Sequence, residues 1–541
     1  MALPSLPDDW NLDQDLLVLM GAGAEKQLES WQKLGLKRGL AIVPEGTPSE
    51  SIEGIPVARR VEELRPFVWS SNVPFRRISM RLTHAGGIDR DAASKWLSTL
   101  GSLAQEHRSF HQTLANLGPL WAGHALQNAA HIAANPMVGD FGVPFRGKPM
   151  IVVGAGPSLG KNIHALKAAQ GRAVIVAVHR ALESLDRAGI VPDLTIAIEP
   201  RDVRHQFEDV GIERVAACLM CTAVDPNLQD HGAQRTIYFT SQAREHWILG
   251  PQDHDHEVLS LGTVSHSAVN LGKRWGCDPI IMVGQDLAFT DGDVYHREGA
   301  DGSARIEQGP ESGQWVLAGF GAELSKTLQG VEKDWFNVVE VPAVGGGTVM
   351  TSTSFDGFRR TLEDMAREWE GQVELINCTE GGADIVGWRN ARLADTVAGL
   401  GPLGLEVGPH LDACQEPSRV ALRGPAISEN VAACRGHLEE VVTLSRACVD
   451  LIGRLLKKPS PKVMRKLEPK ENRLKAVSKQ LPALTLSTHH DITLIASRAK
   501  GLSDINDSLR LSLEMYRTIH RHARALLSGR YAEECVYSAH G

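Results

Sequence analysis

Aromatic residues are scarce in this sequence: 12 Phe, 11 Trp and 5 Tyr make up about 5% of 541 residues. Proteins that bind single-stranded nucleic acid stack bases on such side chains. The chain also lacks an overall positive charge, because 65 Asp and Glu outweigh 57 Lys and Arg and give a net charge of -8. We therefore expect no binding of nucleic acid.

Long apolar runs are missing as well. No run reaches the ~18–20 residues of a membrane-spanning helix, so no membrane span is expected. The N-terminal stretch MALPSLPDDWNLDQD has neither the basic start nor the apolar centre of a signal peptide, which predicts a cytoplasmic protein.

Cysteines are few, since eight in 541 residues cannot form a disulfide scaffold. Cys218 and Cys221 have C-x-x-C spacing inside VAACLMCTAV. Because no second Cys/His pair at zinc spacing accompanies them, a buried strand is favoured over a metal or redox site.

The composition is that of a globular protein, with 43% hydrophobic and 23% charged residues. An N-terminal α/β domain is predicted at 1–145, where DLLVLMGAG, AEKQLESWQKLG and RGLAIVPEG form a β-α-β start and 96–135 looks helical. A linker is predicted at 396–425 and a helical C-terminal domain at 426–541. The last region holds 19 Lys and Arg against 12 Asp and Glu, so it has a net charge of +7. Either an acidic partner or ordinary solvated helix faces would account for this charge.

The central domain is predicted at 146–395. Its apolar runs alternate with helical stretches, which favours a mostly parallel, doubly wound, Rossmann-like sheet. These runs are MIVVGAG, AVIVAV, LTIAIEP, AACLMCTAV, IYFTS, IIMVGQD and VELINCT.

The sharpest motif follows the first of these runs. Gly154 and Gly156 allow close approach of a ligand to the backbone, Pro157 fixes φ for a first helical turn, and Ser158 offers a hydroxyl. The helix LGKNIHALKAAQ is expected next, and its N-terminus favours an anion. The spacing fits neither G-x-G-x-x-G nor a P-loop, so an anion-binding turn of another class is predicted, with a structural turn as the alternative.

Polar residues end the other strands of this sheet. His179 and Glu199 follow the second and third strands, and the carboxyl ends of parallel strands face one crevice. Glu199 is placed to bind ribose hydroxyls. A second cradle is predicted where Thr263, Val264 and Ser265 begin a helix.

A further strand ends in Gln285 and Asp286, and the loop TDGDVYHREG follows with Asp291, Asp293 and His296. This cluster offers a general base. For Asp291 and Asp293 a solvated loop is favoured over a cation site, and His254 and His256 are not expected to bind a metal. GGGTVMTS and the stretch TEGG look like active-site turns or lids.

Five segments together resemble the motility-associated factor (Maf) family of flagellin glycosyltransferases. They are GAGPSLGKN, HRALESLDRAGIVPDLTIAIEP, SAVNLGKRWGCDPIIMVGQDLAFT, YHREG and INCTEGGADIVG. The resemblance covers roughly 145–390, and the flanks only by layout. It implies transfer of a nonulosonic acid, of the pseudaminic, legionaminic or sialic type, from its CMP-activated donor to Ser or Thr of flagellin, with no further cofactor.

The central domain is also similar to bacterial CMP-sialic acid sialyltransferases. That likeness implies that three groups of residues bind CMP. These are Gly154, Gly156, Pro157 and Ser158; then His179 and Glu199; and then Thr263, Val264 and Ser265, beside which lies Gln285. The family has asparagines where this chain has His179 and Glu199. It also has a catalytic histidine in the region of GGGTVMTSTS, which here contains none.

The general base must therefore differ, and we expect Asp286 or His296, with Glu199 behind them, in an inverting attack on the donor. A departing monophosphate gains charge that helix N-termini and hydroxyls stabilise, so no metal is expected. Two alternatives stay open: a pterin diphosphokinase-like transferase that uses ATP and magnesium, and a non-catalytic flagellin-binding chaperone.

Overall fold

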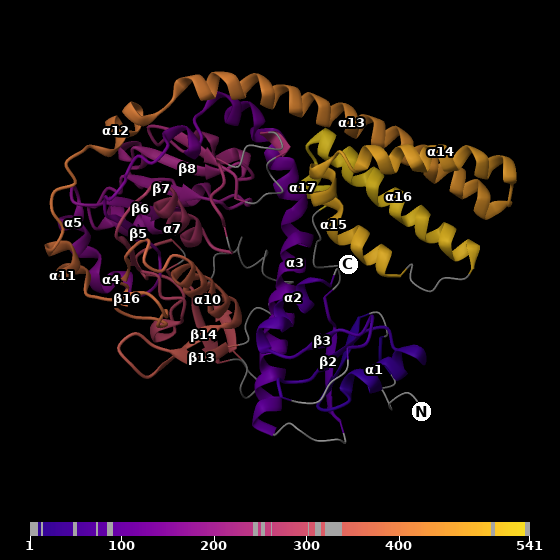
Figure 1. Ribbon diagram of the computed structural model, residues 1–541. Helices are drawn as coiled ribbons and strands as arrows, with labels where there is room; N and C mark the ends of the chain where they lie inside the picture. The colour runs from indigo at the N-terminus through magenta and orange to yellow at the C-terminus, as the bar shows by residue number, and fades with distance from the viewer. Residues whose placement is uncertain are drawn as a thin grey trace. The chain divides into compact units, whose positions relative to one another are not determined.

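The computed structural model describes residues 9–11, 14–46, 51–71, 74–83, 90–241, 247–249, 255–260, 262–300, 302–308, 315–319, 338–498 and 504–535. The chain divides into two compact units, drawn in Figure 1. The first comprises Met1–Gly118, Glu440–Val477 and Ser487–Ala523, and the second comprises Pro119–Glu439, Ser478–Leu486 and Arg524–Gly541.

The first unit contains a small parallel sheet in the order β3-β2-β1-β4. Its elements are β1 (Asp15–Met20), α1 (Ala24–Lys33), β2 (Gly39–Ile42), β3 (Val57–Ala58), α2 (Leu64–Trp69) and β4 (Arg77–Leu82). Alternate residues of β1 face opposite sides, so Leu16 and Val18 enter one apolar cluster and Leu17 and Leu19 enter another. The predicted β-α-β start is confirmed.

Long helices supply most of the remaining regular structure of the C-terminal region. They are α13 (Pro417–Lys457), α14 (Pro461–Ser478), α15 (Pro482–Ser497), α16 (Ile505–Ser528) and the short α17 (Tyr531–Glu534). The prediction of a helical C-terminal region is confirmed. The stretch predicted as a linker is itself partly helical, because it holds α12 (Val407–Cys414) and the first turns of α13. The bounds predicted for the four segments, 1–145, 146–395, 396–425 and 426–541, remain predictions.

The second unit is organised around an eight-stranded sheet in the order β16-β15-β10-β5-β6-β7-β8-β9, and every neighbouring pair is parallel. The strands are β5 (Met150–Val153), β6 (Val174–Val178), β7 (Leu194–Ala197), β8 (Ala217–Cys221), β9 (Thr236–Phe239), β10 (Ile280–Val283), β15 (Leu375–Asn377) and β16 (Arg389–Asn390). The predicted mostly parallel, doubly wound sheet is confirmed.

The chain order of these strands reverses between β5 and β10. From β5 the chain runs outward through β6, β7, β8 and β9, and then crosses to the other side of β5 to form β10. In open α/β sheets the crevice at such a switch point is where ligands bind. The candidate residues after β5 and β10 therefore lie at the position where the topology favours a site.

Both faces of this sheet are buried. Ile151, Val153 and Ile281 point into one apolar cluster, together with residues of α4 (Leu159–Asn162), α5 (Leu166–Ala169), α6 (Leu182–Arg187) and α11 (Leu393–Ala398). Met150 and Val152 point into the other, with residues of α7 (Val264–Arg274) and α10 (Thr353–Glu368). Two covered faces explain why the strands read as continuous apolar runs.

Cys218 and Cys221 are buried within β8, as the apolar run predicted. Burial raises the pKa of the Cys218 thiol. A thiol that stays protonated is a poor nucleophile and a poor metal ligand.

Two antiparallel hairpins accompany the sheet: β11 (Arg305–Gln308) with β12 (Trp315–Ala318), and β13 (Val338–Pro342) with β14 (Thr348–Ser352). The GGGTVMTS stretch was expected to form an active-site turn or lid. Gly345–Gly347 make the tip of the second hairpin and the rest is β14, and a role in an active site stays a prediction. All three tip glycines have positive φ, which glycine adopts without strain. Ser352 then caps α10 by accepting a hydrogen bond from the Phe355 N–H at 3.1 Å.

The longest helix of the N-terminal half is α3 (Arg90–Ala134), which includes the predicted helical stretch 96–135 except for its last residue. Its last part, from Pro119, belongs to the second unit. There the side-chain amide of Asn128 donates to the carbonyls of Thr222 and Val224 at 3.0 and 2.8 Å. Among the described helices, none combines the length and the apolar character needed to cross a bilayer.

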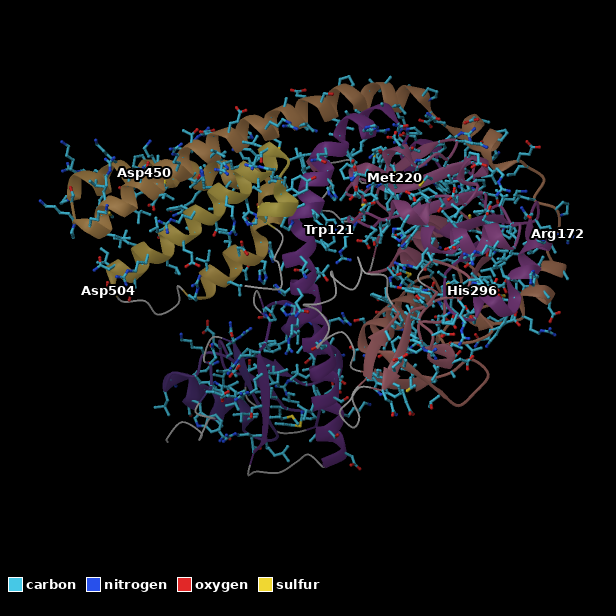
Figure 2. All side chains as sticks on the ribbon, turned by 180° about the vertical axis from the view of Figure 1, so that it is seen from behind. Trp121, Arg172, Met220, His296, Asp450 and Asp504 are labelled. Carbon is cyan, nitrogen blue, oxygen red and sulfur yellow. The ribbon has the colours of Figure 1, made fainter. Side chains whose placement is uncertain are left out.

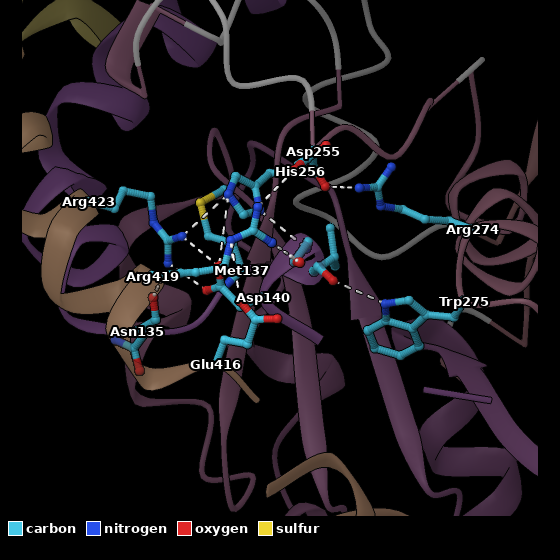
Figure 3. Close-up of polar contacts among 12 residues, drawn as sticks. Asn135, Met137, Asp140, Asp255, His256, Arg274, Trp275, Glu416, Arg419 and Arg423 are labelled. Atoms are coloured by element: carbon cyan, nitrogen blue, oxygen red, sulfur yellow. Dashed lines mark hydrogen bonds and ion pairs between the residues drawn. The ribbon is translucent and has the colours of Figure 1, made fainter. Parts of the chain in front are cut away.

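A buried ion pair fixes the start of α13 within the second unit (Figure 3). The guanidinium of Arg423 donates to both carboxylate oxygens of Asp140, at 2.8 and 2.7 Å, and the two side chains are 5% and 0% exposed. His256 completes the cluster, since its Nδ1 accepts the Gly139 N–H at 3.1 Å and its Nε2 lies 3.3 Å from Arg423. This histidine is therefore structural, whereas His254 lies outside the described residues.

Candidate active site at the switch point of the sheet

The turn after β5 is attached directly to the end of β10. The Gly154 N–H donates to the Val283 carbonyl at 2.8 Å, and the Gly156 N–H donates to the Gly284 carbonyl at 2.7 Å. A Cβ on Gly156 would lie 2.1 Å from Asp286 Oδ2, and one on Gly154 would lie 2.5 Å from the Gly284 oxygen. Only glycine permits this approach, so the two glycines serve the contact between strands.

Asp286 closes the same turn with its side chain. Ser158 donates to the Asp286 carboxyl group twice, through its N–H at 3.2 Å and through Oγ at 2.8 Å. Thr290 Oγ1 donates to Asp286 Oδ1 at 2.7 Å. Thr290 was not singled out in the sequence, although its position four residues after Asp286 in QDLAFT was the available signal.

The Asp286 carboxyl group is 1% exposed, and this burial raises its pKa. The hydrogen bonds from Thr290 and Ser158 and the charge of Lys161 act in the opposite direction. A carboxyl group held by three donors and closed off from solvent is suited to positioning the turn. The N–H and the hydroxyl of Ser158, which were predicted to meet a phosphate, are therefore already hydrogen-bonded to Asp286.

The second predicted cradle, at Thr263–Ser265, contacts Gln285, the residue before Asp286. Ser265 Oγ donates to Gln285 Oε1 at 2.6 Å, and the Gln285 N–H donates to Thr379 Oγ1 at 3.2 Å. Because Gln285 and Asp286 are consecutive, the turn at Ser158 and the turn at Ser265 meet at the end of β10. The structure thus brings together two motifs that are about a hundred residues apart in the chain.

The helices behind the two turns differ in length. The predicted helix LGKNIHALKAAQ is broken into α4, a 3₁₀ turn at Ile163–Ala165 and α5, so that α4 has four residues. In contrast, α7 has 11 residues, and its N-cap Thr263 makes no side-chain capping hydrogen bond. The partial positive charge of an α-helix start is therefore better developed at α7.

His296 approaches the first turn from the loop after β10 (labelled in Figure 2). Its backbone N–H donates to the Ala155 carbonyl at 2.9 Å, and its ring Nδ1 lies 2.9 Å from Ser184 Oγ. Its ring Nε2 is close to the backbone of Gly160, since a Cβ built on that glycine would lie 2.8 Å from it. Burial lowers the pKa of His296, which favours the neutral ring. Ser184, on α6, was not predicted from the sequence.

His179 and Glu199 lie at the ends of β6 and β7. His179 is buried, its ring stacks on Phe207 with centroids 5.8 Å apart, and its Nδ1 lies 3.2 Å from the Ile196 oxygen. Desolvation lowers the pKa of His179 to about 4. The side chain of Glu199 is 30% exposed and accepts the Arg201 N–H at 3.2 Å. Since β7 is two strands from β5 in the sheet, Glu199 lies about 10 Å along the sheet edge from the turn after β5.

A third loop, the predicted TEGG stretch after β15, packs against Asp286. A Cβ on Gly382 would lie 2.4 Å from the Asp286 backbone, and the Ala383 N–H donates to the Asp286 carbonyl at 2.8 Å. Glu380 and Leu287 both have positive φ, of 59° and 47°, although neither is glycine. Such backbone strain is concentrated at functional sites, and here it surrounds one carboxyl group.

Within the described ranges no group of three His, Cys, Asp or Glu side chains is arranged to hold a metal ion. The expectation of a solvated carboxylate was wrong for Asp293, which is 8% exposed and accepts from Arg297 Nε at 2.6 Å. Asp291 occupies the 3₁₀ turn after Thr290, with φ of 55°.

Comparisons with known proteins agree with this architecture. A family model described as 6-hydroxymethylpterin diphosphokinase MptE-like matches residues 123–292, which include both turns and the end of β10. The search of curated protein sequences found no match. The chain is also similar to a solved Maf glycosyltransferase from Magnetospirillum magneticum AMB-1. The TM-score is 0.56 at 15% sequence identity, over 95% of this chain and 78% of that one.

The structure is that of a Rossmann-like α/β protein with a helical C-terminal region, and the candidate site lies at the switch point of its sheet. More particularly, the chain shares its overall fold with a Maf glycosyltransferase, as the motif resemblance predicted.

Proposed function

We propose that this chain is a glycosyltransferase that moves a nonulosonic acid from a CMP-activated donor to serine or threonine hydroxyls of flagellin. The observation that carries the proposal is the meeting of two strand-end turns at Gln285 and Asp286, on the switch point of a sheet with a glycosyltransferase fold. The donor and the acceptor come from the motif resemblance.

In this proposal the departing CMP phosphate binds at the start of α7. The N–H groups of Val264 and Ser265 precede the first intrahelical hydrogen bonds, and the Thr263 hydroxyl is not used as a cap. At the other turn, Asp286 already accepts from Ser158. Hydrogen-bond donors fixed beside an oxygen that gains charge lower the barrier to its departure.

His296 is the better of the two expected bases. Its ring is held through Nδ1 near Ser184, while Nε2 is directed toward the turn at Gly160. In the proposed step Nε2 takes the proton of the acceptor hydroxyl, the hydroxyl oxygen bonds to the anomeric carbon, and the bond to the phosphate oxygen breaks with inversion. Glu199 is assigned to the ribose, and Asp286 to holding the turn in place.

The decisive experiment is the intact mass of flagellin co-expressed with this protein and a source of CMP-nonulosonate. Wild type is expected to add the mass of the sugar, and His296→Asn to slow the addition about 10²–10⁴-fold. CMP should still raise the Tm of His296→Asn, because this residue is not assigned to donor binding. Unmodified flagellin with wild-type enzyme and donor would reject the proposal.

The family model for residues 123–292 favours a second candidate, a diphosphokinase-like transferase that uses ATP and magnesium. A thermal-shift panel separates the candidates, since a ligand that binds only the native state at about 100 times its Kd adds about 2.7 kcal/mol of stability. Stabilisation by CMP supports the glycosyltransferase and stabilisation by ATP with Mg²⁺ supports the second candidate. Stabilisation by neither supports a non-catalytic, flagellin-binding chaperone.

A further inference from the structure

A groove lies between α13 and α14 in the first unit. Figure 1 shows these two helices side by side, and Figure 2 labels Asp450 of α13. The cavity volume is about 590 Å³. It is lined by Leu444, Ala447, Asp450, Leu451 and Arg454 of α13 and by Arg465, Lys466, Pro469, Lys470 and Arg473 of α14.

The spacing of these residues explains the groove. On each helix they recur at intervals of three and four residues, so they form a single stripe. An ion pair ties the two helices together, because Arg473 donates to the two carboxylate oxygens of Glu440 at 2.6 and 2.9 Å. Apolar side chains contribute to the lining from both helices, and Leu451 is 9% exposed.

The charge of the groove is one-sided. Five of the lining residues are cationic and only Asp450 is acidic. Arg454, Arg465 and Lys466 form no ion pair with any residue in the described part of the chain. Like charges gathered over an apolar strip repel one another, and an anionic occupant with apolar groups would relieve this repulsion while covering the strip.

We infer that this groove binds an acidic peptide segment of a partner protein, with its apolar side chains on the strip and its carboxylates against the basic rims. A helix that carries both kinds of side chain satisfies such a groove. None of the lining residues is aromatic, so the groove offers no platform for bases. A concave strip between charged rims also fits a peptide better than a flat lipid surface.

The test uses the full chain and a fluorescein-labelled peptide built from Glu, Leu and Ala, and anisotropy reports binding. The variant Arg465→Glu/Lys466→Glu is expected to bind about tenfold more weakly, and binding should weaken as salt is raised. Lys475→Glu is the matched control, because Lys475 is exposed on the same helix but does not line the groove. It should bind within about twofold of wild type.

A milder variant, Arg465→Gln/Lys466→Gln, protects the result against misfolding and should give an intermediate loss. The inference is overturned if the peptide does not bind, or if Lys475→Glu weakens binding as much as the groove variant. It is also overturned if phosphatidylserine vesicles or a single-stranded oligonucleotide displace the peptide and bind more tightly. No sugar donor is present, so the outcome is independent of the transfer proposal.

Discussion

Two buried aspartates in the second unit have opposite surroundings. Asp140 accepts from both terminal nitrogens of Arg423, and a Met137 N–H at 2.8 Å adds a third donor. Within the described part of the chain, Asp286 accepts from neutral groups of Ser158 and Thr290. Both side chains are 1% exposed or less.

The difference shows that burial alone does not decide what a carboxyl group does. Beside a guanidinium, the carboxylate charge is compensated and the pair acts as a structural tie. Among neutral donors no hydrogen-bonded cation from the described residues compensates the charge, and burial raises the pKa of Asp286 while the hydrogen bonds from Thr290 and Ser158 lower it. The first aspartate positions a helix, and the second positions a turn at the switch point.

The largest effect on stability is expected from a substitution of Asp140. Asp140→Ala leaves the Arg423 guanidinium buried without its partner, which should lower the free energy of unfolding by about 3–5 kcal/mol. Urea unfolding followed by tryptophan fluorescence measures this loss. The double variant Asp140→Ala/Arg423→Met should recover part of it, because no buried charge then remains. A loss below about 1 kcal/mol would show that the pair is not a structural tie.

Asp286→Ala should cost less, about 1–3 kcal/mol, because it leaves hydrogen-bond donors unpaired but no opposite charge. The same unfolding measurement applies. Thr290→Val is the matched control, since it removes one of the donors and leaves the carboxyl group in place. If Asp286→Ala were as costly as Asp140→Ala, the two aspartates would not differ as described.

A third carboxyl group extends the comparison to pH. Burial raises the pKa of Asp193 to about 6, and Asp193 Oδ2 accepts the Ile175 N–H at 2.8 Å. Its folded pKa lies above the unfolded value, so its ionisation costs stability as pH rises from about 4 to about 6. Asp193→Asn should remove about 1–2 kcal/mol of this loss, seen as a flatter plot of Tm against pH. An unchanged slope contradicts the expectation.

The smallest effect is expected at Lys161, whose charge lowers the pKa of Asp286. Lys161 is exposed, so Lys161→Met should change the free energy of unfolding by only ~0.5 kcal/mol. The change should appear as a steeper loss of Tm with rising pH, and it should vanish in an Asp286→Asn background. The same shift in that background would mean that Lys161 acts elsewhere.

The fold could be predicted from the sequence where the pattern was local. Each of the seven apolar runs of the central region became a strand, because a strand buried on both faces needs apolar residues throughout. The helix after Ser158 could not be predicted as broken. Its residues suit a helix, but Asn162 donates to the Cys378 carbonyl and to Glu380, contacts from far along the chain.

The candidate site was predictable in part for the same reason. Glycines and polar residues after apolar runs identified the turn at Gly156 and the end of β10. Thr290 and Ser184 were missed because their importance depends on which side chain they meet. The GGGTVMTS stretch could not be recognised as part of a β-hairpin, because a glycine-rich hairpin and a glycine-rich cradle have similar sequences and only pairing with β13 distinguishes them.

The sequence by itself determined the parallel sheet, the helical C-terminal region and the glycine-rich strand ends, because each depends on residues close together in the chain. Tertiary structure decided that the turns at Ser158 and Ser265 meet at β10 and that Asp286 holds one of them. It also decided that basic residues of α13 and α14 face a common groove. These depend on the crossover from β9 to β10 and on the packing of helices, and both bring together residues that no local pattern connects.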